Sequence, residues 1–329
     1  MKRNLFVPVL LTIIIALFSC FTVFAQESAD DHYPVTITNF NYAGDEITLT
    51  FEKAPERVLA VYQGSIETMI ALGLEDHVIA SYGLDNKIKD EWQAGFEKMN
   101  YNDSSFAPDK ETVIMMNPDL IFSWGSLFGE KMLGDVDYWI SSGTNTYMNT
   151  NTRPGGNRLM ENEFTDILNI GKIFNVEEKA QALVDQMRND LAVIRLAVEA
   201  EEEKPVVAII RIRDSEIRNF GKELAGDILA NMGVEVMQSA ERYMGKEDLI
   251  NENPDVIFIE YMPRPDKGGD AIREEQLAKL LDDPSFASLK AVQNKRVYTI
   301  MLGEIYAPAV RTGDGIRTIA NGLFPGIFD

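Results

Sequence analysis

The sequence predicts an α/β protein of two lobes, each built on a parallel sheet, joined by one long α-helix. Short apolar strands alternate with helices along most of the chain, which is the pattern of parallel sheets covered by helices. The segment ETVIMMNPDLIF at residues 111–122 recurs as EDLINENPDVIF at residues 247–258, an offset of 247 − 111 = 136 positions. Between the two copies, residues 176–202 carry one apolar stripe at three- and four-residue steps.

The N-terminus has the layout of a secretory signal peptide. Lys2 and Arg3 precede an apolar run over residues 5–24, and polar residues follow. We expect residues 1–25 to be this peptide, cleaved after Ala25. The alternatives are a lipid anchor on Cys20 as the mature N-terminus, or an uncleaved membrane anchor. The mature protein is thus expected in the periplasm or outside the cell.

Composition excludes several classes of function. Loss of residues 1–25 removes Lys2 and Arg3 and leaves 29 basic against 52 acidic side chains, a formal charge of −23. Such a chain repels nucleic-acid phosphates. Cys20 is the only cysteine, so no disulfide is predicted for the mature domain. His32 and His77 are the only histidines, so no metal site built from protein side chains is predicted.

Residues 26–160 are predicted to form the first lobe. Residues 35–38 and 47–50 alternate in polarity and read as a hairpin. An apolar strand at 57–61 leads into a helix at 66–72, and further strands are expected at 78–81 and 120–122. In the repeated segment, the helix at 111–116 must end at Asn117, because a residue before proline is pushed out of the α region.

Residues 161–203 are predicted to link the lobes, and residues 204–329 to form the second lobe. A helix over 176–202 would be about 35 to 40 Å long, enough to cross the back of both lobes; an ordinary helix inside one lobe is the alternative. Strands are then expected at 206–210, 256–259 and 296–300, and helices at 224–232, 277–281 and 316–323. Two lobes with similar order make duplication of architecture a better explanation of the repeat than coincidence, which is the alternative because a helix, Asn-Pro-Asp and a strand are a common local arrangement.

Two facing lobes define a cleft, because open parallel sheets bind ligands beyond the carboxyl ends of their strands. The residues expected there are Tyr62, Gln63, Tyr82 and Trp124 in the first lobe and Arg211, Arg213, Tyr261 and Arg264 in the second. The loop at 144–153 adds Tyr147 and Arg153. Aromatic faces suit a flat ligand and guanidinium groups suit carboxylate or phenolate oxygens, so a flat anionic ligand is predicted. Alternatively, Arg211 and Arg213 pair with Asp214 and Glu216 at the surface.

Catalytic motifs are not supported. Residues 63–67 read QGSIE rather than the G-x-S-x-G of a nucleophile elbow, and histidine is almost absent. Neither a dinucleotide-binding glycine motif nor a phosphate loop occurs. The remaining enzyme alternative is a secreted glycosidase using cleft carboxylates such as Glu260 and Glu304.

Several local motifs carry a resemblance to a known family. They are APERV at 54–58 before a strand, SIET at 65–68 opening a helix that ends ALGL at 71–74, and the two Asn-Pro-Asp segments. In this order and spacing the mature chain resembles the substrate-binding proteins of ABC importers for iron-siderophores, haem and cobalamin. The resemblance implies two Rossmann-like lobes on one rigid helix, a monomeric carrier without catalysis or cofactor, and modest closure on binding.

The resemblance also implies a ligand class. Cobalamin binders have aromatic residues where Tyr82 and Trp124 stand, whereas siderophore binders use basic residues in the second lobe, as Arg211 and Arg213 would be. Two arginines favour a ferric siderophore; cobalamin or haem is the alternative within the same importer class.

The repeated segment then acquires a role from the resemblance. Members of the family dock on an ABC permease dimer through one glutamate at the top of each lobe, and the matching residues are Glu111 and Glu247. The alternative is that both only complement the helix dipole in a first turn, as we expect for Glu67.

Overall fold

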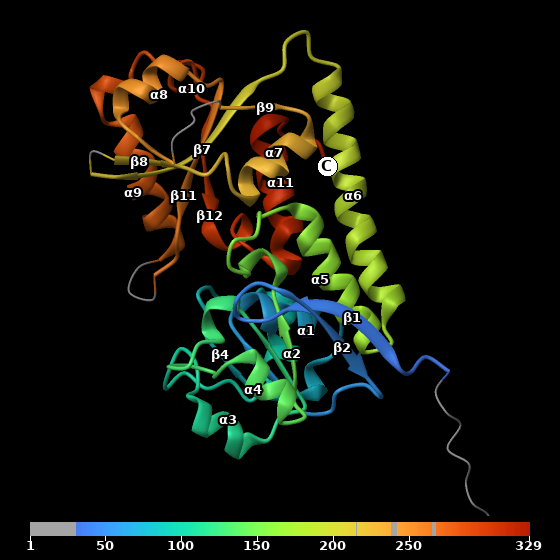
Figure 1. Ribbon diagram of the computed structural model, residues 1–329. Coiled ribbons are helices and arrows are strands. Elements are labelled where there is room, and N and C mark those ends of the chain that lie inside the picture. Colours follow the sequence, from blue (N-terminus) through green and yellow to red (C-terminus); the bar gives the residue numbers. More distant parts are fainter. Residues whose placement is uncertain (1–30, 215, 238–241, 265–267) are drawn as a thin grey trace, which may run out of the picture.

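The computed structural model describes residues 31–214, 216–237, 242–264 and 268–329, and it has two α/β lobes (Figure 1). The predicted signal peptide, including Cys20 and Ala25, lies outside the described residues. Within the described ranges, no helix combines the length and the apolar character needed to cross a bilayer.

The first lobe is built on a four-stranded parallel sheet in the order β4-β3-β5-β6. Its strands are β3 (Val58–Val61), β4 (Val78–Tyr82), β5 (Leu120–Ser123) and β6 (Asn145–Met148). Its helices are α1 (Gln63–Ala71), α2 (Gln93–Phe96), α3 (Lys110–Met116) and α4 (Val136–Ser141). Strand β6 falls in a stretch that the sequence analysis treated as a loop, and it places Tyr147 inside the sheet.

The predicted N-terminal hairpin is confirmed as β1 (Val35–Phe40) paired antiparallel with β2 (Glu46–Phe51). It is joined to the sheet through a side chain. Asn39 is fully buried, its Nδ2 donates to the carbonyl of Met148 (3.0 Å), and its Oδ1 accepts from the N–H of Met148 (2.8 Å). The amide therefore satisfies backbone groups at the edge of β6 as a neighbouring strand would.

The long helix is α6 (Glu177–Glu199), and its 23 residues correspond to about 35 Å. It follows α5 (Met160–Ile173) and runs along one side of both lobes (Figure 1). Ala180, Val184, Ile194 and Val198 are among the stripe residues that it buries. The predicted linking helix is confirmed in place and periodicity.

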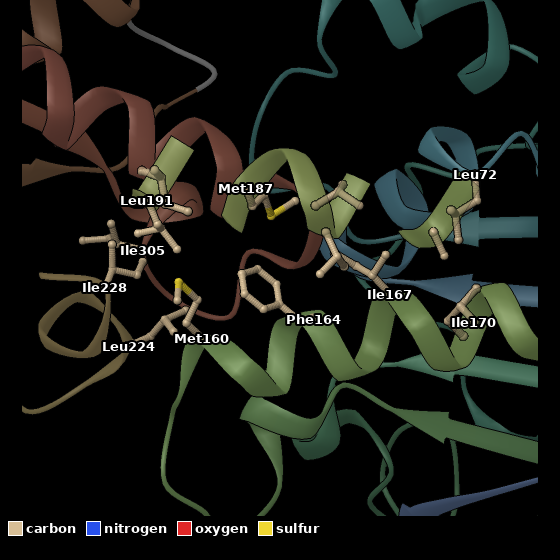
Figure 2. Packing of buried hydrophobic residues seen from close by; sticks show 14 of the residues in the cluster. Leu72, Met160, Phe164, Ile167, Ile170, Met187, Leu191, Leu224, Ile228 and Ile305 are labelled. Carbon is tan, nitrogen blue, oxygen red and sulfur yellow. The ribbon is translucent and has the colours of Figure 1, made fainter. Parts of the chain in front are cut away.

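Each lobe has a buried hydrophobic cluster of its own, and a third cluster runs through both lobes. Figure 2 shows side chains of α5, such as Phe164 and Ile167, facing Met187 and Leu191 of α6. Leu224 and Ile228 of the second lobe belong to the same buried cluster as Leu72 of the first lobe, which is part of Figure 2. The lobes are thus connected by packed apolar surface as well as by chain.

The second lobe has a mixed sheet in the order β10-β8-β7-β11-β12, with β9 beside β7. Its strands are β7 (Val206–Arg213), β8 (Glu216–Asn219), β9 (Glu235–Val236), β10 (Tyr243–Met244), β11 (Val256–Tyr261) and β12 (Val297–Met301). Its helices are α7 (Leu224–Met232), α8 (Lys246–Glu252), α9 (Gly269–Leu281), α10 (Lys290–Gln293) and α11 (Thr312–Leu323). The expected parallel sheet is present as β9, β7, β11 and β12, and β8 and β10 extend it with antiparallel pairing that was not predicted.

The repeated segments have equivalent structures. Helices α3 and α8 end at Asn117 and Asn253, which have left-handed φ values of 47° and 46°. Asp119 accepts hydrogen bonds from two backbone N–H groups just before β3 (2.8 and 2.9 Å), and Asp255 accepts one from the first residue of β7 (2.9 Å). Each Asn-Pro-Asp turn therefore ends a helix and fixes the start of the neighbouring strand.

A buried ion pair joins the lobes. Glu67 on α1 is fully buried and accepts from Nε (2.6 Å) and Nη2 (2.5 Å) of Arg311, which precedes α11. Arg311 also donates to the carbonyl of Lys87 (2.8 Å). Glu67 is therefore an interlobe contact, and the expectation that it only complements a helix dipole is wrong.

Candidate functional site between the lobes

The turn between β3 and α1 places Tyr62 at the cleft end of the first sheet. Its φ is 86°, and its backbone N–H donates to the carbonyl of Tyr82 (2.8 Å). Non-glycine residues rarely adopt this conformation, at a cost of about 1–3 kcal/mol, so the surrounding structure must hold it. The phenol donates to Asp85, and burial raises the pKa of Tyr62, with the Asp85 charge adding to the shift. The ring is thus neutral and fixed in orientation.

Aromatic rings from both lobes meet in the cleft. Tyr62 packs edge-on against Trp124 with 4.6 Å between ring centroids. Trp124 stacks on Tyr306 of the second lobe, with 6.0 Å between centroids and 22° between planes. Tyr306 is held in a loop whose next residue, Ala307, has φ of 52°. Tyr62 and Trp124 therefore lie just beyond β3 and β5, and their contact with a ligand stays a prediction.

Three arginines converge on Glu223 beside these rings. Arg218 and Arg242 each donate from Nη2 to Glu223 Oε1, at 2.7 and 3.0 Å, and Arg158 Nη1 lies 3.8 Å from Oε2. Arg158 also lies over the ring of Tyr306, with 3.6 Å from Cζ to the centroid. Three guanidinium groups and one carboxylate give this group a formal charge of 3 − 1 = +2, in a chain whose net charge is −21. The site is locally positive.

Two donors of this arginine group lack acceptors. Arg218 Nε and Arg158 Nη1 are buried, and neither has a hydrogen-bond acceptor in the described part of the chain. A buried donor without an acceptor costs about 1–3 kcal/mol, which an anionic ligand would recover. The group borders a cavity of about 710 Å³, whose lining includes Arg158, Asn219, Glu223, Asp227, Arg242 and Tyr306.

A second cavity of about 300 Å³ lies at the carboxyl ends of β7 and β11. Four predicted residues share its lining, namely Arg211, Arg213, Tyr261 and Arg264. Arg211 donates from Nε and Nη2 to both oxygens of Glu260, whose side chain is 1% exposed. For Arg211, surface pairing with Asp214 or Glu216 is therefore wrong. This cavity is basic, although Arg211 is paired with Glu260 and Arg264 Nη2 lies 3.8 Å from Glu275 Oε2.

Three predicted ligand residues are instead internal. Gln63 is buried, and its Nε2 donates to Glu67 (2.6 Å). Tyr82 is 3% exposed within the first-lobe core, and Tyr147 is fully buried and donates to Asp166 (2.9 Å). These three are wrong as ligand contacts, because their polar atoms serve the interior of the first lobe.

Arg153 packs against the hairpin rather than into either cavity. Its Cζ lies 4.4 Å from the ring centroid of Phe40 in β1. Its place beyond β6 is therefore separate from the aromatic and arginine groups described above, and Arg153 lines neither cavity.

Glu111 and Glu247 occupy the first turns of α3 and α8, and both side chains are exposed. Within the described residues, neither has an ion-pair partner. The two helices lie in different lobes, on the side away from α6 in the view of Figure 1. Both glutamates are thus accessible to a partner.

The sequence analysis missed Tyr306 and the arginine group. Tyr306 lies 306 − 301 = 5 residues after β12, at the strand end where the other candidates were sought. Arg218 lies on β8, which an alternating pattern across the turn at Asp214 would have revealed. No local sequence pattern marks Arg158 as a site residue, because only the folded structure brings it over the ring of Tyr306.

The carboxylates proposed for a glycosidase are engaged elsewhere. Glu260 is held by Arg211, and Glu304 accepts from the hydroxyl of Thr318 (3.1 Å). Burial raises the pKa of Glu304. Neither carboxylate lines the cavity beside Tyr306.

Two lobes around a cleft with an aromatic and arginine lining define a solute-binding protein. The chain belongs to the family described as periplasmic binding proteins, whose sequence model matches residues 58–301. Members of this family are ligand carriers rather than enzymes, so the glycosidase alternative is not supported. The family also gives the protein an extracytoplasmic location.

Known relatives agree with this assignment. A crystal structure of a periplasmic binding protein from Veillonella parvula has a TM-score of 0.83 and 30% identity, covering 90% of this chain and 93% of that one. The iron-uptake system-binding protein of Bacillus subtilis is 25% identical over 243 residues, 71% of this chain and 72% of the relative. The petrobactin-binding protein YclQ of Bacillus subtilis is 24% identical over 256 residues, 74% of each chain.

Proposed function

We propose that this protein captures a ferric siderophore in the interlobe cleft and delivers it to an ABC permease. The observation that carries the proposal is a pair of buried donors, on Arg158 and Arg218, that have no acceptor among the described residues and lie next to the stacked rings of Trp124 and Tyr306. Together they form an anion-binding group with an aromatic wall.

The chemistry of the site favours an anionic chelate with flat groups. Guanidinium donors bind phenolate or carboxylate oxygens strongly, and aromatic faces pack against aryl rings. The relatives named for iron uptake and for petrobactin support iron chelates as the ligand class. The same names do not favour cobalamin or haem.

The cavity at Arg211 and Arg213 is the outer part of the proposed site. Arg213 is exposed at the end of β7, and Tyr261 and Arg264 lie on the same cavity wall. A chelate larger than the inner cavity of about 710 Å³ would extend toward these residues.

Fluorescence titration of the mature chain tests the ligand. We expect ferric catecholate or ferric hydroxamate chelates to quench the fluorescence at sub-micromolar concentrations, and the Trp124→Phe variant to lose most of the signal. Saturable binding of cobalamin or haem, with no response to either iron chelate, would contradict the proposal.

Substitutions at Arg158 and Tyr306 test whether the ligand binds at the arginine and aromatic residues. Arg158→Gln and Tyr306→Ala are each expected to weaken binding about tenfold or more, since a hydrogen bond to a charged group contributes about 1.5–3 kcal/mol. Arg188→Gln is the matched control, because it removes an equal charge from an exposed pair with Glu161 on α5. Equal losses in Arg158→Gln and Arg188→Gln would indicate a general charge effect and not this site.

Docking is proposed at Glu111 and Glu247, which would meet basic residues of the permease. Changing both to Lys should abolish uptake and leave chelate affinity unchanged. Glu178→Lys, an exposed residue on α6, is the control for charge reversal. Unchanged uptake in the double variant would remove this part of the proposal.

We further propose export by residues 1–25, ending either in cleavage after Ala25 or in lipidation of Cys20. The intact mass of the secreted protein distinguishes the two routes, because only lipidation of Cys20 leaves an N-terminus that carries a diacylglycerol group. A Cys20→Ala variant would then be released from the membrane.

A further inference from the structure

Tyr306 is carried by a turn at residues 305–311, between β12 and α11 of the second lobe. Ile305, Ala307 and Ala309 in this turn are buried, and Tyr306 is half-buried. Ala307 and Ala309 have φ values of 52° and 51°, a left-handed conformation that alanine rarely adopts. Contacts from outside the turn must therefore hold it in this shape.

A buried carboxyl group of helix α5 contacts the backbone of this turn. Glu163, in the first turn of α5, is 1% exposed, and its Oε2 accepts the backbone N–H of Ala309 at 2.6 Å. Ala309 is also 1% exposed, and a buried N–H that loses its acceptor is unfavourable. Glu163 therefore stabilises the turn at one of its two left-handed residues.

The other oxygen of Glu163 is held by an amide whose orientation is fixed. Asn151 Nδ2 donates to Glu163 Oε1 at 2.6 Å. Asn151 Oδ1 accepts from the N–H of Leu159 (2.9 Å) and from Nδ2 of Asn162 (2.8 Å). Turning this amide over would lose both bonds, so its N–H group stays aimed at Glu163. The carboxyl group is thus fixed between a first-lobe amide and the second-lobe turn.

The end of the turn next to α11 is anchored by other groups. Arg311 is paired with Glu67, and the hydroxyl of Thr312 donates to the carbonyl of Ala309 (2.7 Å). Tyr306 lies on the opposite side of Ala309 from these two contacts. Loss of the bond to Glu163 would therefore leave the α11 end attached and release the part that carries Tyr306.

We propose that Glu163 is a positioning residue for ligand binding, because its carboxyl group holds the turn that presents Tyr306 to the cleft. This inference rests on the function proposed above and adds a residue to the same site. Tyr306 stacks on Trp124 and lies under Arg158, with 3.6 Å from Cζ to the ring centroid. A shift of the turn would separate the ring from both. Glu163 lines neither cavity of the cleft, so it acts through Tyr306.

The size of the effect follows from the population of the binding conformation. When a fraction of the molecules keeps the turn in place, the apparent affinity is reduced by that fraction. Loss of one buried hydrogen bond, which leaves the left-handed conformations of Ala307 and Ala309 unsupported, changes such an equilibrium roughly tenfold. We therefore expect Glu163→Ala to weaken chelate binding about tenfold.

Fluorescence titration with ferric catecholate and ferric hydroxamate chelates compares two substitutions at this position. Glu163→Ala removes both acceptor oxygens, whereas Glu163→Gln keeps one oxygen at the same length. That oxygen should face Ala309, because Asn151 Nδ2 retains a second acceptor in the carbonyl of Leu159 (2.8 Å). We expect the Gln variant to bind within about threefold of the parent. Equal losses in the two variants would overturn the inference, since an acceptor oxygen would then not be what holds the turn.

A double-mutant cycle with Tyr306→Ala distinguishes positioning from general damage. If Glu163 acts through the ring, Glu163→Ala should weaken binding about tenfold in the parent and less than about twofold in the Tyr306→Ala background. Losses of equal size in the two backgrounds would overturn the inference.

Asp190→Ala is the matched control for loss of a buried carboxylate. Asp190 on α6 is 8% exposed and accepts from Nε of Arg317 on α11 (2.6 Å). Its removal should lower the melting temperature and leave chelate affinity unchanged. A loss of affinity equal to that of Glu163→Ala would overturn the inference, because any weakening of the contacts around α6 would then suffice.

Near-ultraviolet circular dichroism without ligand gives a readout that is independent of the ligand. The contribution of Trp124 is the difference between the spectra of the parent and of Trp124→Phe. We expect this contribution to change in Glu163→Ala, as it does in Tyr306→Ala, and to be retained in Glu163→Gln and Asp190→Ala. An unchanged contribution in Glu163→Ala would overturn the inference.

Failure of the proposed function has a different signature. In that case no iron chelate binds the parent protein, and the ligand-free spectra alone decide whether Glu163 positions Tyr306. Failure of this inference instead leaves chelate binding by the parent intact and gives the Glu163→Ala variant the same affinity as the parent.

Discussion

Replacing Arg311 with Met should destabilise the protein strongly, because it removes the partner of a buried carboxylate. Glu67 is 0% exposed, and after the change it would keep only the hydrogen bond from Gln63 (2.6 Å). Removing one member of a buried ion pair typically costs about 3–5 kcal/mol, since the other charge is left without compensation. We expect a loss of this size in the free energy of unfolding near neutral pH.

Loss of the ion pair between Glu67 and Arg311 should also change the pH dependence of stability, and a second substitution should compensate for it. Burial raises the pKa of Glu67, and Arg311 opposes that shift. Without Arg311 the raised pKa remains, so stability is retained at low pH and lost as the pH rises and the carboxyl ionises. The deficit should therefore be smaller at pH 5 than at pH 8. Adding Glu67→Gln should restore part of the lost stability, because it removes the buried charge.

Urea unfolding of the mature chain, followed by circular dichroism, measures these effects. Lys53→Met is the matched control, since its ion pair with Glu56 is at the surface and should leave the midpoint unchanged. An Arg311→Met variant within about 1 kcal/mol of the parent at both pH values would refute the reasoning. A double variant less stable than the single one would also refute it.

Two other predictions concern stability. Burial raises the pKa of Glu163 to about 8, above its usual 4.5, so its neutral form is favoured on folding, and stability declines as the pH rises toward and through 8. Glu163→Gln should flatten the melting temperature between pH 5 and pH 8; curves parallel to the parent would contradict this. Asn117→Ala should cost about 1 kcal/mol at its left-handed φ, whereas Asn117→Gly should be nearly neutral, and equal melting temperatures of the two variants would show that backbone strain is not the cause.

The architecture was predictable because its signals are local. The apolar stripe of α6 has a clear helical period, and the Asn-Pro-Asp turns have a physical reason to end a helix at Asn117 and Asn253. The gapless repeat then implied equivalent lobes. The extension β8–β10 was missed because the sequence analysis ended the strand at residue 210, whereas β7 continues to Arg213.

The site was less predictable because its contacts are distant in sequence. Inspecting strand ends selected Tyr62 and Trp124, which follow β3 and β5 and contact each other, and their contact with a ligand stays a prediction. It also selected Gln63 and Tyr82, since position after a strand does not reveal whether a side chain turns inward. The interaction between Arg158 and Tyr306 spans 306 − 158 = 148 residues and exists only in the folded protein.

The shared core has a consequence for how the protein is made. Val35 near the start and Leu323 near the end belong to one buried cluster, so one side of each lobe's interior is completed only when the other lobe is present. A chain emerging through a membrane N-terminus first would expose the apolar faces of α5 and α6 until the second lobe arrived. Contacts so distant in sequence also slow folding. Exchanging lobes between relatives to change the ligand would therefore require transferring α5, α6 and α7 as one piece.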